Sequence, residues 1–187
     1  MASKLEKWNR IYQNKDHPGD PAEFLVNHAH LLPEQGTALD LASGLGANAE
    51  FLHRAGLETQ AWDLSPVAID KLKQRQSSIS THVRDVEAHP PAANSFDVIV
   101  VTEFLFRPIC PHIVAALRPN GLLFYRTFHR DKVSNSGPSN PDYLLKNNEL
   151  LTLFGDLRVL FYEEANRFGR IHCGERNRAS LIAAKLE

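Results

Sequence analysis

The chain has 187 residues, of which 43% are hydrophobic and 23% charged, as expected for one globular domain with a single core. Its formal net charge of -1 gives no overall field that would recruit nucleic acid or an anionic membrane. Cys110 and Cys173 are the two cysteines, which excludes a disulfide scaffold and favours a reducing cytosol. No segment approaches the roughly 20 apolar residues of a membrane span. We therefore expect a cytoplasmic protein that does not enter the membrane.

The predicted elements alternate between short apolar strands and helices. Two helices, over 5–14 and 22–32, are expected on either side of a Pro/Gly break. Strands are expected over 37–43, 58–65, 79–87, 95–105, 121–130, 157–165 and 178–187. Helices are expected over 47–56, 66–76, 111–121 and 147–156. Strands that alternate with helices predict βαβ units on a parallel sheet.

The last two predicted strands are joined by a loop without a helix, which predicts a hairpin and hence an antiparallel strand at the C-terminal end. The predicted fold is therefore a Rossmann-like, doubly wound, seven-stranded α/β sheet that is mostly parallel. We expect residues 1–187 to form a single domain, with 1–35 as an N-terminal helical cap and 36–187 as the Rossmann-like core.

The segment ALDLASGLGANAEFL, residues 38–52, predicts a buried strand, a glycine turn and a helix. Gly44 and Gly46 fit the G-x-G-x-x-G/A pattern, which is compatible with a dinucleotide or with S-adenosylmethionine, because both cofactors need a close approach of the backbone. Asp40, at the end of the strand, disfavours a pyrophosphate and favours a cation. Asp63, at the end of the second strand, suits the ribose of either cofactor. The balance favours S-adenosylmethionine.

Four segments resemble the motifs of class I S-adenosylmethionine-dependent methyltransferases: LDLASGLGAN, AWDLSPVAIDKLK, RDVE and FDVIVVTEF. Within that superfamily, KWNRIY...DPAEFL, FLFRPICPHIVAALRPNGLLFYRTF and NPDYLL...ELLTLFGDLRVLFYEEA are similar to the tellurite-resistance and thiopurine methyltransferase-like branch. The resemblance spans nearly the whole chain. It implies an S-adenosylmethionine-dependent methyltransferase.

The resemblance also implies roles for individual residues. Asp40 is expected to neutralise the methionyl ammonium, Asp63 to hold the ribose, and Asp85 with Val86 to meet the adenine. The full set expected to bind the cofactor is Asp40, Ser43, Gly44, Gly46, Asn48, Asp63, Leu64, Asp85, Val86 and Thr102.

The acceptor is expected beyond the carboxyl ends of the later strands, where ligands bind in open parallel sheets. The candidates there are Glu103, Arg107, His129 and Tyr143, with no catalytic residue assigned. The Arg and His residues of these loops suggest an anionic acceptor, although exposed loops are polar in any case.

We thus expect methyl transfer to a small-molecule acceptor, such as a thiol, a tellurite- or selenite-type anion or another heteroatom nucleophile, with no metal and no nucleic-acid partner. An NAD(P)-dependent oxidoreductase and a cofactor-binding regulator without turnover are the alternatives. The oligomeric state is left open.

Overall fold

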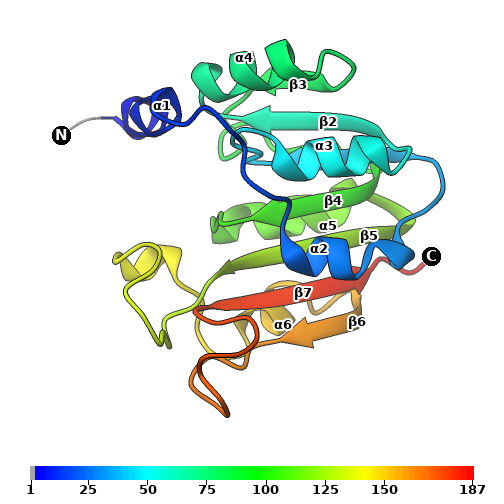
Figure 1. The fold of residues 1–187 in the computed structure, drawn as a ribbon. Helices are drawn as coiled ribbons and strands as arrows, with labels where there is room; N and C mark the ends of the chain where they lie inside the picture. Colours follow the sequence, from blue (N-terminus) through cyan, green and yellow to red (C-terminus); the bar gives the residue numbers. More distant parts are fainter. Residues whose placement is uncertain (1–2) are drawn as a thin grey trace.

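The sheet has seven strands in the order β3-β2-β1-β4-β5-β7-β6 (Figure 1). The computed structural model describes residues 3–187. The strands are β1 Thr37–Leu41, β2 Glu58–Asp63, β3 Ser80–Val83, β4 Phe96–Thr102, β5 Leu117–Phe128, β6 Arg158–Glu163 and β7 Arg178–Ala184. β1 to β5 pair in parallel, and β7 runs antiparallel to both β5 and β6. The predicted fold class, including the antiparallel C-terminal strand, is confirmed.

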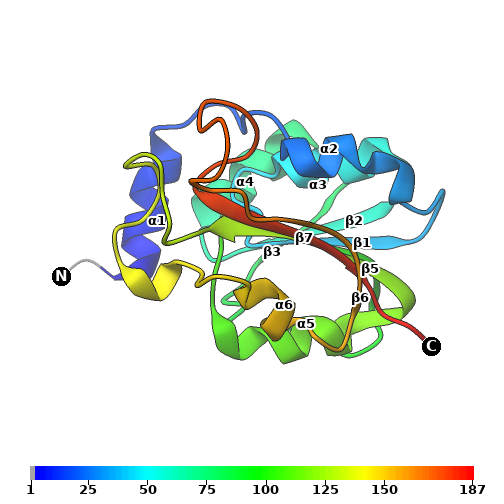
Figure 2. The same ribbon diagram turned by 90° about the horizontal axis from the view of Figure 1, so that it is seen from below.

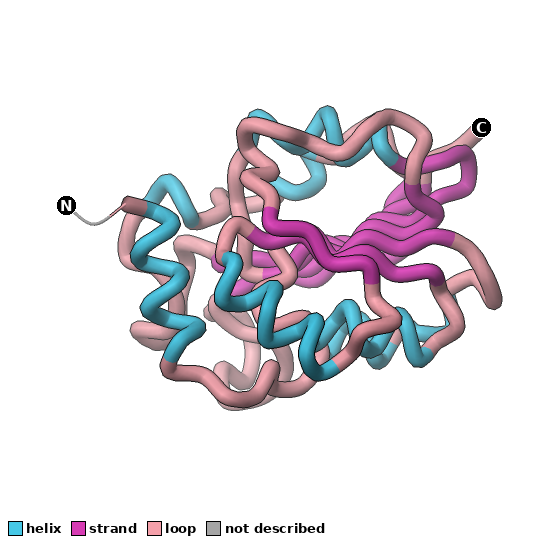
Figure 3. The backbone as a smooth tube through the Cα atoms, turned by 90° about the horizontal axis from the view of Figure 1, so that it is seen from above, coloured by secondary structure: helices cyan, strands magenta, loops and turns pink. Residues whose placement is uncertain are grey.

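Helices cover both faces of this sheet (Figures 2 and 3). The helices are α1 Lys4–Gln13, α2 Glu23–Asn27, α3 Ala47–Arg54, α4 Pro66–Arg75, α5 Cys110–Ala116 and α6 Glu149–Leu153. α2 and α3 pack on one face, where Phe24 and Leu52 share a buried cluster with Val98 and Phe124. α4 extends this face toward β2 and β3. α5 and α6 cover the opposite face.

The two cores follow the alternation of side chains along the strands. On β4, Val98 and Val100 face the α2 and α3 side, whereas Ile99 and Val101 face the α5 and α6 side. All four are completely buried, because a central parallel strand is covered on both faces. This is why residues 98–102 read as a continuous β-branched run in the sequence.

Several predicted boundaries were wrong: the strand predicted over 79–87 ends at Val83, and two helices are shorter than predicted by about five residues. The helix predicted over 111–121 ends at Ala116, and residues 117–120 belong to β5. Pro119 disfavours helical geometry at the residue before it, and the extended backbone at Leu117 pairs with Phe96 instead. The helix predicted over 22–32 breaks at His28, where a separate 3₁₀ turn, Ala29–Leu31, begins.

α1 lies beyond the carboxyl ends of the parallel strands, at the same end of the molecule as the loop that follows β5 (Figures 1 and 2). Ser3 and Glu6 form a capping box at its start, and none of its residues is buried. α2 lies on one face of the sheet instead, where Phe24 and Leu25 are buried in the core. Within residues 3–187, no helix is long and apolar enough to cross a membrane.

Candidate functional site

A cavity of about 1050 Å³ lies at the carboxyl ends of the parallel strands, between the sheet and α1. Its wall is formed by side chains of α1, by the segments that follow β1 to β4, and by the end of β5 with the loop after it. This is the edge at which ligands bind in open parallel sheets. A second hollow of about 400 Å³, lined by Thr37 and His53, lies at the opposite edge and contains none of the predicted site residues.

Nine of the ten predicted cofactor-binding residues line the large cavity: Ser43, Gly44, Gly46, Asn48, Asp63, Leu64, Asp85, Val86 and Thr102. Asp40 is completely buried and lies next to this wall, beneath the glycine turn. Residues far apart in the sequence are therefore brought together as the parallel topology requires.

The glycine turn brings the backbone against neighbouring side chains. Gly44 and Gly46 have φ values of 53° and 83°, in the left-handed region that favours glycine. A Cβ atom on Gly44 would lie 2.8 Å from the Tyr12 hydroxyl, and one on Gly46 would lie 2.5 Å from Leu72 Cδ2. Both positions therefore require glycine for space as well as for conformation.

Asp63 anchors the turn through both carboxylate oxygens. Its Oδ2 accepts a hydrogen bond from the Gly44 amide at 2.8 Å, and its Oδ1 accepts one from the Ser65 amide at 2.8 Å. Burial raises the pKa of Asp63, and the two amide hydrogen bonds oppose that rise. Asp63 thus links the end of β2 to the turn that follows β1, besides lining the cavity.

Asp40 is only half satisfied. Its Oδ2 accepts a hydrogen bond from the Ala49 amide at 3.0 Å, whereas its Oδ1 is buried without a partner among the described residues. Burial, reinforced by the charge of Asp63, raises the pKa of Asp40 to about 7. The hydroxyl of Ser43 likewise has no partner in the described part of the chain. Two unsatisfied oxygen atoms beside a glycine turn fit a ligand with an ammonium group, as in S-adenosylmethionine.

α1 covers the part of the cavity next to the glycine turn with two stacked aromatic rings. The rings of Trp8 and Tyr12 have centroids 5.7 Å apart, and both residues line the cavity. Burial raises the pKa of Tyr12 above its usual value, and the nearby Asp63 and Asp40 add to this effect. Lys71 on α4 holds the end of α1, because its Nζ donates to the carbonyl oxygens of Tyr12, Gln13 and Lys15 at 2.8–3.2 Å.

Asn48, in the first turn of α3, joins three parts of the cavity wall. Its Oδ1 accepts from the Ala22 amide at 2.9 Å, and its Nδ2 donates to the Thr102 hydroxyl at 3.0 Å. The segment between α1 and α2 is thereby fixed to the end of β4. Asn48 is therefore a structural link of the wall as well as a residue exposed to the cavity.

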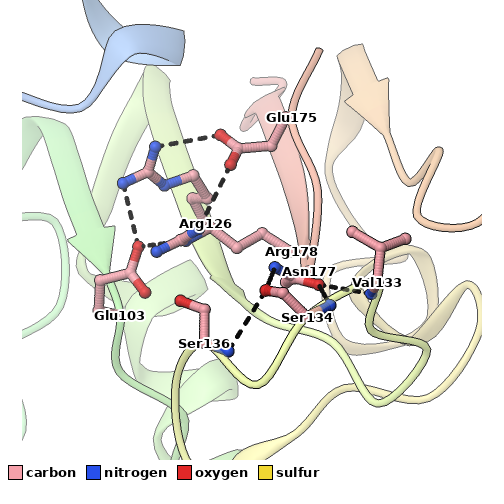
Figure 4. Close-up of polar contacts among 8 residues, drawn as sticks. All are labelled: Glu103, Arg126, Val133, Ser134, Ser136, Glu175, Asn177 and Arg178. Atoms are coloured by element: carbon pink, nitrogen blue, oxygen red, sulfur yellow. Dashed lines mark hydrogen bonds and ion pairs between the residues drawn. The ribbon is translucent and has the colours of Figure 1, made fainter. Parts of the chain in front are cut away.

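The other half of the cavity is bounded by a network of two carboxylates and two guanidinium groups (Figure 4). Glu103 follows β4 with a left-handed φ of 57°, and its Oε1 accepts from Arg126 Nη2 at 3.0 Å and Arg178 Nε at 2.7 Å. Arg126 also contacts Glu175 Oε2 at 3.1 Å through Nη1. Glu103 and Arg126 line the cavity, so this network presents one negative and one positive group to it.

Of the four acceptor-side candidates, Glu103 and Tyr143 line the cavity, but Arg107 and His129 do not. Arg107 forms a two-pronged ion pair with Glu149 and thereby ties the start of α5 to α6. His129 is completely buried, and its Nδ1 accepts from the Asp131 amide at 2.9 Å.

Other basic loop residues are also engaged in contacts within the chain. Arg176 donates to the carbonyl oxygens of Asn166, Phe168, Arg170 and Cys173 and so holds residues 166–176 as a compact loop. Arg167 forms an ion pair with Asp131. These basic side chains therefore stabilise loops.

Several wall residues were not predicted from the sequence, chiefly Arg126, Phe128, Gly137 and Pro138. Arg126 follows the apolar run of residues 122–125 in β5, and a charge at that place was the available signal. The contributions of Gly137 and Pro138 depend on how the loop after β5 folds back, which periodicity does not reveal.

Comparisons with known proteins agree with this geometry. Residues 38–121 match the family model described as a methyltransferase domain. No curated protein matches the chain significantly. Among solved structures, TehB from Haemophilus influenzae superposes with a TM-score of 0.74 at 20% identity, covering 96% of this chain and 67% of that one.

Two further structures show the same fold. An S-adenosylmethionine-dependent methyltransferase from Mesorhizobium loti gives a TM-score of 0.70 at 14% identity, over 93% of this chain and 100% of that one. A TehB-like methyltransferase from Corynebacterium glutamicum gives 0.67 at 18% identity, over 97% of each chain. Residues 38–121 therefore match a methyltransferase domain, and the chain has the fold of these S-adenosylmethionine-dependent methyltransferases. The match supports an enzyme that uses S-adenosylmethionine as its cofactor.

Proposed function

We propose that this enzyme transfers the methyl group of S-adenosylmethionine to a small-molecule acceptor, either a thiol, a tellurite- or selenite-type anion, or another heteroatom nucleophile. The observation that carries the proposal is a cavity with two distinct halves. One is built on the glycine turn and its buried acids, and the other on Glu103, Arg126 and aromatic side chains. A volume of about 1050 Å³ is at the upper end of the range for ligand pockets and leaves room for an acceptor beside the cofactor.

For the cofactor half, we assign the ammonium to the charge of Asp40, the methionyl chain to the turn at Gly44 and Gly46, and the ribose to Asp63. Ser43, Asn48, Leu64, Asp85, Val86 and Thr102 complete this half, with Asp85 and Val86 at the adenine. The unpaired Oδ1 of Asp40 supports the first assignment. Because Asp40 has no exposed surface, its charge acts on the ammonium from beneath the turn.

For the acceptor half, Glu103, Arg126, Phe128 and Tyr143 orient the acceptor beside the cofactor half. When bound, S-adenosylmethionine supplies a methyl group on a positively charged sulfur. The protein then has to align the acceptor atom and exclude water, and such alignment contributes roughly 7–11 kcal/mol. A general base is required only for an acceptor that must lose a proton, so a thiolate or an oxyanion reacts without one.

The charges of the wall support a small acceptor. Five basic and five acidic side chains line the cavity, namely Lys4, Lys7, Lys15, Arg84, Arg126, Asp20, Asp63, Asp85, Glu87 and Glu103. This balance suits a compact acceptor with at most a small net charge, and it does not suit a nucleic acid, whose phosphates require an excess of basic groups. The resemblance to the tellurite-resistance and thiopurine methyltransferase-like branch supports thiols and tellurite-type anions as the first acceptors to try.

We also propose that the enzyme acts in the cytoplasm and that residues 1–187 work as one domain. The free thiols of Cys110 and Cys173 support a reducing compartment. The contact of Tyr12 with the glycine turn supports a cap that works together with the core.

The test is the release of S-adenosylhomocysteine with thiophenol, selenite, tellurite, a phenol and an amine as acceptors. We expect turnover with at least one of them. In Glu103→Gln, kcat/KM for that acceptor should fall about 10- to 100-fold, because one carboxylate serves two guanidinium groups, while the cofactor Kd stays within about twofold. Glu34→Gln, an exposed change outside the cavity, is the matched control.

Two results would contradict the proposal. Tight cofactor binding without S-adenosylhomocysteine release across the panel would favour the regulator without turnover. Unaltered kinetics in Glu103→Gln would remove Glu103 from the acceptor site.

A further inference from the structure

Asn177, immediately before β7, holds the loop after β5 through its side chain (Figure 4). Its Oδ1 accepts hydrogen bonds from the amides of Val133 and Ser134, at 2.7 and 3.2 Å. Its Nδ2 donates to the Ser134 hydroxyl at 2.8 Å, and that hydroxyl oxygen accepts from the Ser136 amide at 3.3 Å. The Asn177 side chain, which is only 6% exposed, therefore satisfies the hydrogen-bonding groups of a turn some 40 residues earlier in the sequence.

The turn held in this way leads directly into the cavity wall. Gly137 follows with a φ of 81°, and a Cβ atom there would lie 2.3 Å from carbons of the Phe128 ring. The backbone of Gly137 is therefore packed against that ring. Lys132 Nζ donates to the carbonyl oxygen of Pro138, which closes the loop on itself. Phe128, Gly137 and Pro138 all line the cavity on its acceptor side.

Asn177 is itself fixed by its neighbours in the sequence. Glu175 contacts Arg126, and Arg178 contacts Glu103, so the residues on both sides are joined to the acceptor half of the cavity. The carbonyl oxygen of Asn177 accepts from the His129 amide at 2.8 Å, at the end of β5. The position of the loop is thus fixed relative to the charged network that borders the acceptor half of the cavity.

We propose that Asn177 is a positioning residue for the acceptor: its side chain fixes residues 133–138, so that Gly137 and Pro138 form the acceptor wall next to Phe128. This inference rests on the proposed function, because it assumes that the acceptor occupies this half of the cavity. Loss of the side chain frees the loop and leaves the cofactor half intact, since none of the contacts of Asn177 reaches the glycine turn.

Two substitutions distinguish the role of the Asn177 side chain from that of its backbone conformation. Asn177 has a φ of 62°, which glycine adopts without strain, so Asn177→Gly removes the contacts and retains the conformation. Asn177→Asp keeps oxygen acceptors for the amides of Val133 and Ser134, and the Ser134 hydroxyl can donate to the new carboxylate. Asn120→Gly is the matched control, because Asn120 is exposed, also has a φ of 63°, and lies at the far end of β5.

The experiment measures hydrogen exchange of residues 129–140, the cofactor Kd, and steady-state kinetics with the panel acceptor that the unaltered enzyme methylates best. In Asn177→Gly we expect the amides of Val133 and Ser134 to exchange about tenfold faster or more, since each loses a hydrogen bond. The acceptor KM should rise at least fivefold, while kcat and the cofactor Kd stay within about twofold. This pattern is expected when a contact that binds the substrate and the transition state equally well is lost. Asn177→Asp and Asn120→Gly should remain close to the unaltered enzyme.

Three results would overturn the inference. Unchanged exchange in Asn177→Gly would show that the side chain does not hold the loop. Faster exchange with an unchanged acceptor KM would show that the held loop does not position the acceptor. Equal losses in acceptor KM, kcat and cofactor Kd would indicate a general structural role. Failure of the proposed function is seen separately, as absence of methyl transfer by the unaltered enzyme.

Discussion

Asp40 is the residue to which we assign the charge that interacts with the cofactor. Its carboxylate is buried with one oxygen satisfied by the Ala49 amide and the other without a partner in the described residues. Leaving a buried acceptor unsatisfied costs stability, and a cation bound above the glycine turn would be attracted by the charge of Asp40 without touching it. A buried acid with a raised pKa next to a cavity is a candidate site for a positively charged ligand.

Replacing Asp40 by Asn should weaken S-adenosylmethionine binding by roughly 1–3 kcal/mol at pH 8, because a charge-assisted interaction becomes a neutral one. Titration calorimetry measures this difference. Asp70→Asn, an exposed change on α4, is the isosteric control and should leave the Kd unaltered. An unchanged Kd in Asp40→Asn would remove the role assigned to this carboxylate.

At the residue scale, nine of the ten residues predicted to bind the cofactor line the cavity, whereas two of the four acceptor-side candidates do not. Asp40, Gly44 and Asp63 belong to local patterns, in which a strand end and a turn fix where the side chain lies. Arg107 and His129 were chosen because they follow the later predicted strands, at the edge of the sheet where ligands bind. Whether such a side chain faces a cavity or an internal partner depends on tertiary packing, and here Arg107 pairs with Glu149.

At the scale of elements, α1 is attached to the core mainly through polar contacts. No α1 residue is buried, Lys4 pairs with Glu87, and Asn9 Oδ1 accepts from the Ser65 hydroxyl at 2.6 Å. Lys71 supplies three more hydrogen bonds at the end of the helix. Elements with few buried apolar contacts open locally at low free-energy cost. α1 is therefore the part of the wall best suited to move when the cofactor enters.

Lys71→Met should release the end of α1, since three carbonyl oxygens lose their donor. We expect the amides of α1 to exchange several-fold faster, and the cofactor Kd to rise about 3- to 10-fold, because about 1 kcal/mol of attachment is lost. Hydrogen exchange and calorimetry on the same preparations test this. Lys73→Met, on the exposed side of α4, is the control. Equal exchange in the two variants would contradict the attachment.

The existence and order of the elements followed from periodicity, whereas several boundaries did not. The start of β5 at Leu117 is set by Pro119 and by pairing with Phe96, a partner 21 residues away. The short α2 is held by burial of Phe24 and Leu25 against the sheet. Tertiary contacts of this kind override local helix preference.

At the scale of the whole molecule, buried acids make stability depend on pH. Asp40 has a pKa of about 7 in the folded state, against an ordinary value near 3.8. Between these values the folded chain binds a proton that the unfolded chain does not. This contribution to stability is therefore complete below about pH 4 and is lost as the pH rises through about 7. The raised pKa of Asp63 acts in the same direction.

Without cofactor, the free energy of unfolding should fall from pH 5 to pH 7.5, by up to about 3 kcal/mol for a pKa shifted by this amount. Asp40→Asn should flatten this dependence, because its amide does not titrate. Urea unfolding at several pH values provides the measurement. If the free energy of unfolding of Asp40→Asn falls by the same amount, another group causes the pH dependence.

The position of β7 has a consequence for the synthesis of the protein. β7 is the last of the seven strands to leave the ribosome, yet it lies between β5 and β6 and carries Asn177 at its entrance. Until residues 177–184 have emerged, one edge of β5 stays unpaired and the loop at residues 133–138 lacks its hydrogen bonds to the Asn177 side chain. A nascent chain stalled before that point would therefore already contain the glycine turn. The loop at residues 133–138, which contributes Gly137 and Pro138 to the cavity wall, would not yet be held in place.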